Sequence, residues 1–206
     1  MVQQKDVIME AFKSVPEDSI LYLSVDADNY YVTMLAAMEH VKNTLELPGI
    51  YVTASRSAER IRSQLKLEKI DAHKLYYVDT IAILSGTRTS HPAIQMVESP
   101  AMLETIILKI KWFLRHIKDE SRFVFLDSIN ALAVYNEPKL MCEFLHVLIN
   151  LMSTRDVMTI LFAVKEQTPQ DVQQVLKLSS DDVIEVTEEG VSLNGKLLTM
   201  IGPDGL

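Results

Sequence analysis

The sequence predicts an α/β fold in which helices cover both faces of a mostly parallel sheet. Short apolar runs alternate with longer amphipathic segments, which is the order produced when a helix connects each strand to the next. The apolar runs are largely continuous, as expected for strands that are buried on both faces. A turn signal near the C-terminus adds a β-hairpin. Together these observations predict a three-layer α-β-α domain.

Six apolar runs are the candidate strands: 20–25, 50–53, 75–78, 123–126, 157–164 and 183–186. Asn194-Gly195 is a strong signal for a two-residue hairpin turn, and the apolar segments 191–193 and 196–201 flank it. The stretch 85–98 is expected to be a long loop. No internal repeat, low-complexity tract or linker is visible, so residues 1–206 are expected to form one domain.

Five segments carry helical signals. In 31–45, apolar residues recur at three- and four-residue steps and form one stripe for packing on the sheet. A second helix is expected at 57–67. Ser99-Pro100 and Thr168-Pro169 each predict a helix start, with a capping hydroxyl before a proline at the first helical position. The second of these two helices is expected to end near Leu178.

The remaining helix, 138–152, is apolar around most of its circumference. Such a helix must be covered on more than one side. Two interpretations remain open: the helix is enclosed between the sheet and a neighbouring helix, or one of its faces forms a subunit interface.

Composition and charge restrict the class of protein. The chain has 206 residues, of which 48% are hydrophobic and 23% charged, as in a soluble domain with a full core. No run approaches the roughly 20 apolar residues of a membrane span, and the N-terminus lacks the pattern of a signal peptide. Cys142 is the single cysteine, which favours a cytoplasmic location. The net charge of −8 argues against nucleic-acid binding.

The turn after the first strand lies where a nucleotide-binding protein would have its phosphate loop. Such a loop needs glycines whose N–H groups surround the phosphates, followed by a lysine and a Ser or Thr. Here the turn contains Asp26, Asp28, Asn29 and Tyr30, with neither glycine nor lysine. We therefore expect no bound cofactor. Instead, Asp28 or Asn29 is expected to cap the following helix, so that a side chain takes the electrostatic role of a phosphate.

The order of elements resembles the KaiC/RecA-like ATPase family, particularly its archaeal KaiC-like branch. The segment 122–128, an apolar strand ending in Asp127-Ser128, looks like a Walker B strand, and 49–53, 76–79 and 181–186 support the resemblance. It covers about residues 20–186. It implies a RecA-like core and oligomers built by side-by-side packing, with the chain itself or with an active relative.

The chain departs from this family at two places. Active members carry a Walker A loop with Gly-Lys-Thr after the first strand, and adjacent acidic residues after the next strand that activate the attacking water. This chain has no lysine before Thr33, which is expected on the helix surface, and Thr53-Ala54-Ser55-Arg56 replaces the acidic pair. Without phosphate partners, Asp127 and Ser128 are expected to end their strand and cap local backbone groups rather than bind a metal.

The sequence thus predicts a degenerate family member that lacks the phosphate-loop lysine and the catalytic acid of an ATPase. The leading hypothesis is a non-catalytic domain with a regulatory or scaffolding role through protein–protein contacts. An atypical ATPase or nucleotide sensor, with ATP and Mg²⁺ as cofactors, is a second hypothesis. A third is an accessory protein for DNA recombination or repair, which the negative charge disfavours.

Overall fold

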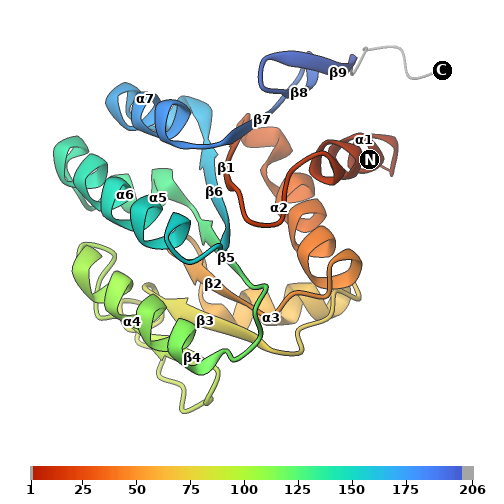
Figure 1. Ribbon diagram of the computed structural model, residues 1–206. Coiled ribbons are helices and arrows are strands. Elements are labelled where there is room, and N and C mark those ends of the chain that lie inside the picture. Colours follow the sequence, from red (N-terminus) through yellow and green to blue (C-terminus); the bar gives the residue numbers. More distant parts are fainter. Residues whose placement is uncertain (1, 201–206) are drawn as a thin grey trace.

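The computed structural model describes residues 2–200, and side chains within 5–198. Its centre is a nine-stranded sheet with the order β4-β3-β2-β5-β6-β1-β7-β8-β9 (Figure 1). The strands are β1 (Ile20–Val25), β2 (Gly49–Thr53), β3 (Leu75–Asp79), β4 (Ile94–Met96), β5 (Phe123–Asp127), β6 (Met158–Val164), β7 (Asp182–Thr187), β8 (Gly190–Leu193) and β9 (Lys196–Met200).

The pairing confirms a mostly parallel sheet with a C-terminal hairpin. The strands from β4 to β7 in this order are all parallel to their neighbours. Strand β8 continues the sheet as the antiparallel neighbour of β7, and β9 pairs antiparallel with β8. The predicted extension of the hairpin to Ile201 falls outside the described residues. Strand β4 was not expected, because it is only three residues long and lies inside the predicted loop 85–98.

Helices cover both faces of the sheet and form two apolar cores (Figure 1). Helices α1 (Val2–Lys13), α2 (Tyr30–Glu39) and α3 (Ala58–Leu67) lie on one face. Helices α4 (Leu103–His116), α5 (Ile129–Ala133), α6 (Pro138–Ser153) and α7 (Gln170–Ser179) lie on the other. The predicted three-layer architecture is confirmed, whereas α1 and α5 were not predicted.

The two Ser/Thr-Pro starts do not act as caps. Helix α4 begins at Leu103, and Ser99 Oγ instead accepts a hydrogen bond from the N–H of Ala101 at 3.2 Å. Thr168 Oγ1 donates to the carbonyl of Val164 at 2.7 Å, so it stabilises the turn before α7 rather than the first turn of that helix. In both places the hydroxyl bonds within its own turn, and the helix starts later.

Helix α6, which the sequence shows to be apolar around most of its circumference, packs against several neighbouring elements. One side of α6, which includes Phe144 and Leu148, is buried against the sheet. Helix α6 also contacts α4, α5 and α7. Leu140 and Val147 nevertheless remain about half exposed, at 49% and 52%. Helix α6 is therefore enclosed by neighbours and also leaves apolar side chains at the surface.

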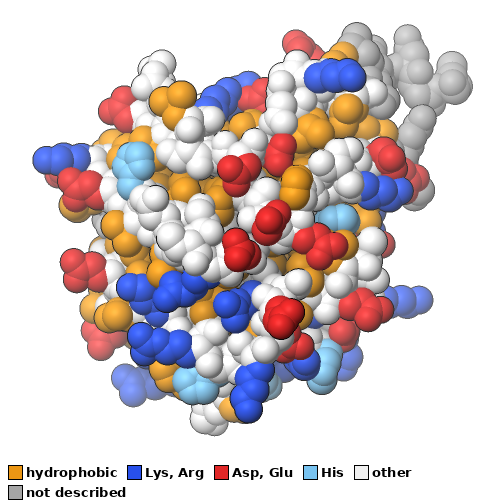
Figure 2. Space-filling view, in the orientation of Figure 1, with side chains coloured by type: hydrophobic (Ala, Val, Ile, Leu, Met, Phe, Trp, Pro, Cys, Tyr) orange, Lys and Arg blue, Asp and Glu red, His pale blue; other side chains and the backbone are white. Residues whose placement is uncertain are grey.

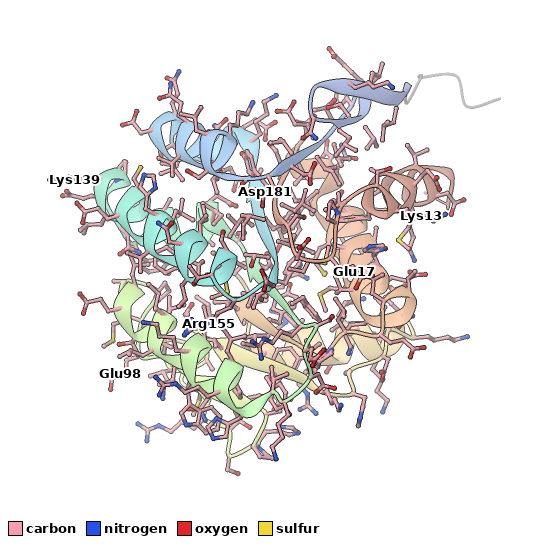
Figure 3. The ribbon with its side chains drawn as sticks, in the orientation of Figure 1. Lys13, Glu17, Glu98, Lys139, Arg155 and Asp181 are labelled. Atoms are coloured by element: carbon pink, nitrogen blue, oxygen red, sulfur yellow. The ribbon has the colours of Figure 1, made fainter. Side chains whose placement is uncertain are left out.

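Strand β1 lies inside the sheet and is fixed at both ends. At its start the carboxylate of Asp181, labelled in Figure 3, accepts a hydrogen bond from the N–H of Ile20 at 2.8 Å. At its end the N–H of Asp26 donates to the carbonyl of Val186 at 3.0 Å. Because the strands from β4 to β7 are parallel, their carboxyl ends meet at one edge of the sheet, which is the edge where α/β proteins bind ligands.

Within residues 2–200, no helix has both the length and the apolar character to cross a bilayer.

Candidate functional site

A buried carboxylate lies at the carboxyl edge of the sheet. Asp127 ends β5 and is fully buried. One of its oxygens accepts a hydrogen bond from the hydroxyl of Tyr30, and the other accepts one from the hydroxyl of Tyr51. Tyr30 is the first residue of α2, and Tyr51 comes from the middle of β2. The two phenols therefore occupy both oxygens of the carboxylate.

Tyr30 is held on several sides. Its ring stacks on Phe162 of β6, with 4.9 Å between the ring centroids. The guanidinium carbon of Arg56 lies 5.5 Å from the centre of the Tyr30 ring, at cation–π distance. The Tyr30 hydroxyl is also 3.2 Å from Ser55 Oγ. Residues that follow β1 and β2, together with Phe162 within β6, thus hold the Tyr30 ring beside Asp127.

Burial dominates the electrostatics of this cluster. Loss of solvent raises the pKa of Asp127, while the two tyrosine hydroxyls and the charge of Arg56 act in the opposite direction. Burial also raises the pKa of Tyr30 and that of Tyr51, and the nearby Asp127 raises both further. The phenols consequently remain protonated near neutral pH, as donors to the carboxylate. Neither carboxylate oxygen of Asp127 is exposed at the surface.

The acidic turn after β1 has a structural role that differs from the predicted one. The carboxylate of Asp26 accepts a hydrogen bond from the N–H of Glu188 at 3.0 Å, which ties this turn to the β7–β8 connection. Asp28 lies in a short 3₁₀ turn, Ala27–Asn29, and is exposed. Asp26 therefore anchors the turn, whereas Asp28 faces solvent, and the two carboxylates have different surroundings.

The predicted helix cap is wrong. Asn29 occupies the position before α2 but makes no side-chain capping hydrogen bond. Its backbone has φ −90° and ψ −5°, whereas a capping residue is normally extended, which turns its side chain toward the first helical N–H groups. The preceding 3₁₀ turn imposes this conformation. The group that fills the space above Asp127 is the ring of Tyr30, not a carboxylate.

Two further expectations need correction. Thr33 is fully buried on α2 rather than at the helix surface. Asp127 and Ser128 do end β5, yet neither caps the next helix: Asp127 binds the two phenols, and Ser128 precedes α5 without a side-chain capping bond. Within the described part of the chain, no group of three or more His, Cys, Asp and Glu residues could hold a metal ion.

Sequence reasoning missed Tyr51, Arg56 and Asp79. Tyr51 is a hydroxyl-bearing residue on a strand predicted to be buried, and its need for a hydrogen-bond partner was an available signal. Asp79 ends β3 and is buried, and its carboxylate accepts hydrogen bonds from the N–H groups of Ala58, Ile81 and Ala82 at 2.6, 2.9 and 2.8 Å. It organises the start of α3 and the following turn.

Solved structures share this fold. The chain matches the KaiC-like protein PH0186 from the hyperthermophilic archaeon Pyrococcus horikoshii OT3 with a TM-score of 0.62 and 18% identity, covering 90% of this chain and 82% of that one. PH0250 from the same organism matches with a TM-score of 0.62, 10% identity and 93% coverage of both chains. PH0321, an uncharacterized protein from Pyrococcus horikoshii, matches with 0.63, 12% identity, and 91% and 86% coverage.

These similarities establish a KaiC/RecA-like fold for the chain. No curated protein matches the sequence. The profile of DUF7090, a family of unknown function, matches residues 43–195, which contain most of the sheet, Asp127 and Tyr51. The chain therefore belongs to the DUF7090 family.

Proposed function

We propose that this chain is a non-catalytic KaiC/RecA-like domain with a regulatory or scaffolding role, which acts through protein–protein contacts in the cytoplasm. The observation that carries the proposal is the saturation of Asp127 by Tyr30 and Tyr51. A nucleotide-dependent relative would need this carboxylate to hold Mg²⁺. Here a metal ion would first have to displace a stacked tyrosine and then reach a fully buried group.

Electrostatics at the turn point the same way. Asp26 and Asp28 lie in the turn that follows β1, and the turn has no lysine to offset them. A carboxylate about 5 Å from a phosphate charge contributes a repulsion of about 3 kcal/mol at an effective dielectric constant near 20. The helix dipole of α2 supplies far less attraction than this. The positive end of α2 is therefore a poor phosphate site in this chain.

A nucleotide titration tests the first part of the proposal. We expect no heat of binding when ATP and Mg²⁺ are added in a calorimeter, and no change in melting temperature. Ligand at 100 times its dissociation constant would stabilise the fold by about 2.7 kcal/mol, or about 5–11 °C for a domain of this size. A micromolar dissociation constant for ATP or ADP would refute the proposal and favour the atypical ATP-binding alternative.

Contacts with other proteins form the second part. PH0321, one of the solved proteins with this fold, was crystallised in complex with an unknown peptide. For the present chain we expect either self-association or capture of an active relative. Light scattering combined with affinity capture measures both. A chain that stays monomeric and captures no protein would contradict the proposed role.

A further inference from the structure

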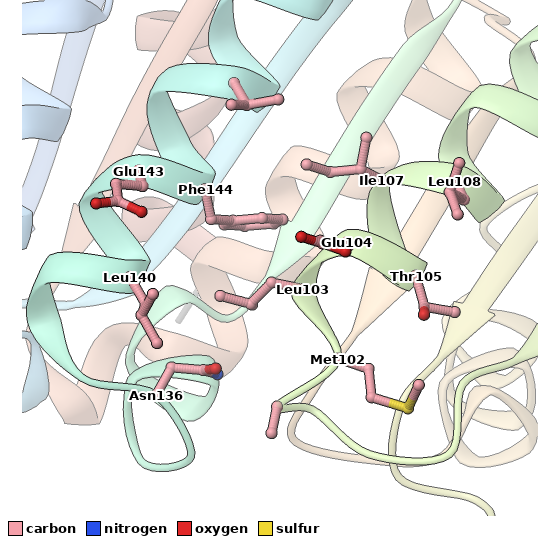
Figure 4. Close-up of a pocket in the computed structure, with 12 residues that line it drawn as sticks. Met102, Leu103, Glu104, Thr105, Ile107, Leu108, Asn136, Leu140, Glu143 and Phe144 are labelled. Atoms are coloured by element: carbon pink, nitrogen blue, oxygen red, sulfur yellow. The ribbon is translucent and has the colours of Figure 1, made fainter.

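An apolar groove runs between α4 and α6, on the outer side of the layer formed by α4–α7. Its volume is about 660 Å³. Figure 4 shows Phe144 pointing from α6 toward α4, with Glu104 and Glu143 on the two sides of the groove. Leu108 is 62% exposed at the α4 side, opposite the half-exposed Leu140 and Val147 of α6. Apolar side chains therefore line the groove, and acidic side chains stand at its rims.

The exposed stripe of α4 has opposite charges at its two ends. Glu104, Leu108, Lys111 and Arg115 recur at four-, three- and four-residue steps, so they share one face of the helix. Glu104 lies in the first turn, whereas Lys111 and Arg115 lie in the second half. Blue Lys and Arg side chains gather over the α4 region in Figure 2. Among the described residues, none of these three charges has an ion-pair partner.

We propose that the groove binds a second copy of this chain, whose α4 packs antiparallel to the first about a two-fold axis. The antiparallel arrangement places Glu104 of each copy opposite Arg115 of the other. These residues are separated by about 16 Å along the helix at 1.5 Å per residue, so both pairs form at once. In this register Leu108 of each copy lies opposite Lys111 of the other, next to the apolar lining of that copy's groove.

Charge complementarity selects a second copy as the occupant. The rims carry Glu104 and Glu143, and the basic half of another α4 provides the matching positive charge together with an exposed leucine. A two-fold contact is self-complementary and closes after two copies. The inference rests on the proposed role in protein–protein contacts and names one partner. The groove is lined by residues of α4 and α6 and the turns before them, so nucleotide binding at Asp127 is a separate question.

Sedimentation velocity across a micromolar concentration series tests the dimer. We expect the unmodified chain to dimerise and Leu108→Lys to weaken dimerisation by at least about a hundredfold, because each dimer loses the leucine contact twice and places two lysines opposite Lys111. Leu178→Lys is the matched control, since Leu178 is 87% exposed at the end of α7 and does not line the groove. Circular dichroism and melting temperature verify that both variants fold.

Charge reversal gives a test that loss of folding cannot imitate. We expect Glu104→Arg alone and Arg115→Glu alone each to weaken dimerisation at least about tenfold, and an equal mixture of the two variants to restore it to within about threefold, because opposite charges then face each other. A monomer at every concentration, larger assemblies that survive Leu108→Lys, or a mixture no tighter than its components would overturn the dimer. A monomer that still captures a different protein would overturn the dimer and leave the proposed function standing.

Discussion

Replacing Tyr51 by Phe removes one of the two hydroxyl groups that hold Asp127. The ring and its packing remain, but one carboxylate oxygen loses its donor in a fully buried place. A hydrogen bond to a charged group contributes about 1.5–3 kcal/mol. We therefore expect Tyr51→Phe to lower the free energy of unfolding by about 2 kcal/mol and the melting temperature by about 4–8 °C.

Tyr77 provides the matched control. Its ring lies 6.1 Å from that of Tyr51 and is equally buried, yet its hydroxyl has no hydrogen-bond partner within the described structure. Removing this hydroxyl deletes an unsatisfied polar group rather than a hydrogen bond. We expect Tyr77→Phe to be neutral or to raise the free energy of unfolding by up to about 1 kcal/mol.

The cost of Tyr51→Phe is also expected to depend on pH. The fold raises the pKa of Asp127 above its unfolded value of about 3.9. The stability linked to this group is therefore greatest below pH 3.9 or so and declines as pH rises through the folded pKa. Loss of a donor raises that pKa further, so the variant should lose more stability at pH 7 than near pH 4, the unfolded value. Urea unfolding at both pH values measures this. An equal cost for Tyr51→Phe and Tyr77→Phe, or a cost that does not change with pH, would refute the reasoning.

Three other predictions concern stability. The ring of His40 stacks on Phe12, and burial, followed by the charge of Lys13, lowers the pKa of His40. The stability linked to His40 should therefore be complete above about pH 6.5 and should fall as the pH drops below that value. We expect His40→Phe to flatten this pH dependence in thermal melts. Gly49→Ala should cost about 1–3 kcal/mol in chemical denaturation, because its Cβ would lie 2.2 Å from the Phe123 ring; a neutral result would mean that the ring can move. Asp79→Ala should lower the free energy of unfolding by about 3 kcal/mol or more, because three backbone N–H groups lose their acceptor. Asp79→Asn should lower it less, and equal losses for the two variants would contradict the hydrogen-bond explanation.

The strands were predictable because continuous apolar runs mark parallel strands buried on both faces. Strand β5 could be found within one residue for this reason. Strand β4 gave no such signal, because it is short and lies at the sheet edge. Helix starts were less predictable, since the hydroxyls of Ser99 and Thr168 had local alternatives to capping.

The candidate site was predictable only in part. The absence of lysine and glycine near Tyr30 and the position of Asp127 at a strand end could be read directly. The partnership of Tyr51 with Asp127 depends on sheet register, which places Tyr51 beside Phe125, two residues before the carboxylate. Register and the stacking of Tyr30 on Phe162 are properties of the folded sheet, because the residues involved are far apart in the chain.

Tyr30 differs from a nucleotide in one respect that matters for any partner. A phosphate group arrives, is cleaved and leaves, so the edge of a working ATPase alternates between arrangements. The phenol ring is covalently attached to α2 and cannot dissociate or be consumed. Under the proposed function, a protein that docks near this edge would meet the same surface whether cellular ATP is abundant or scarce.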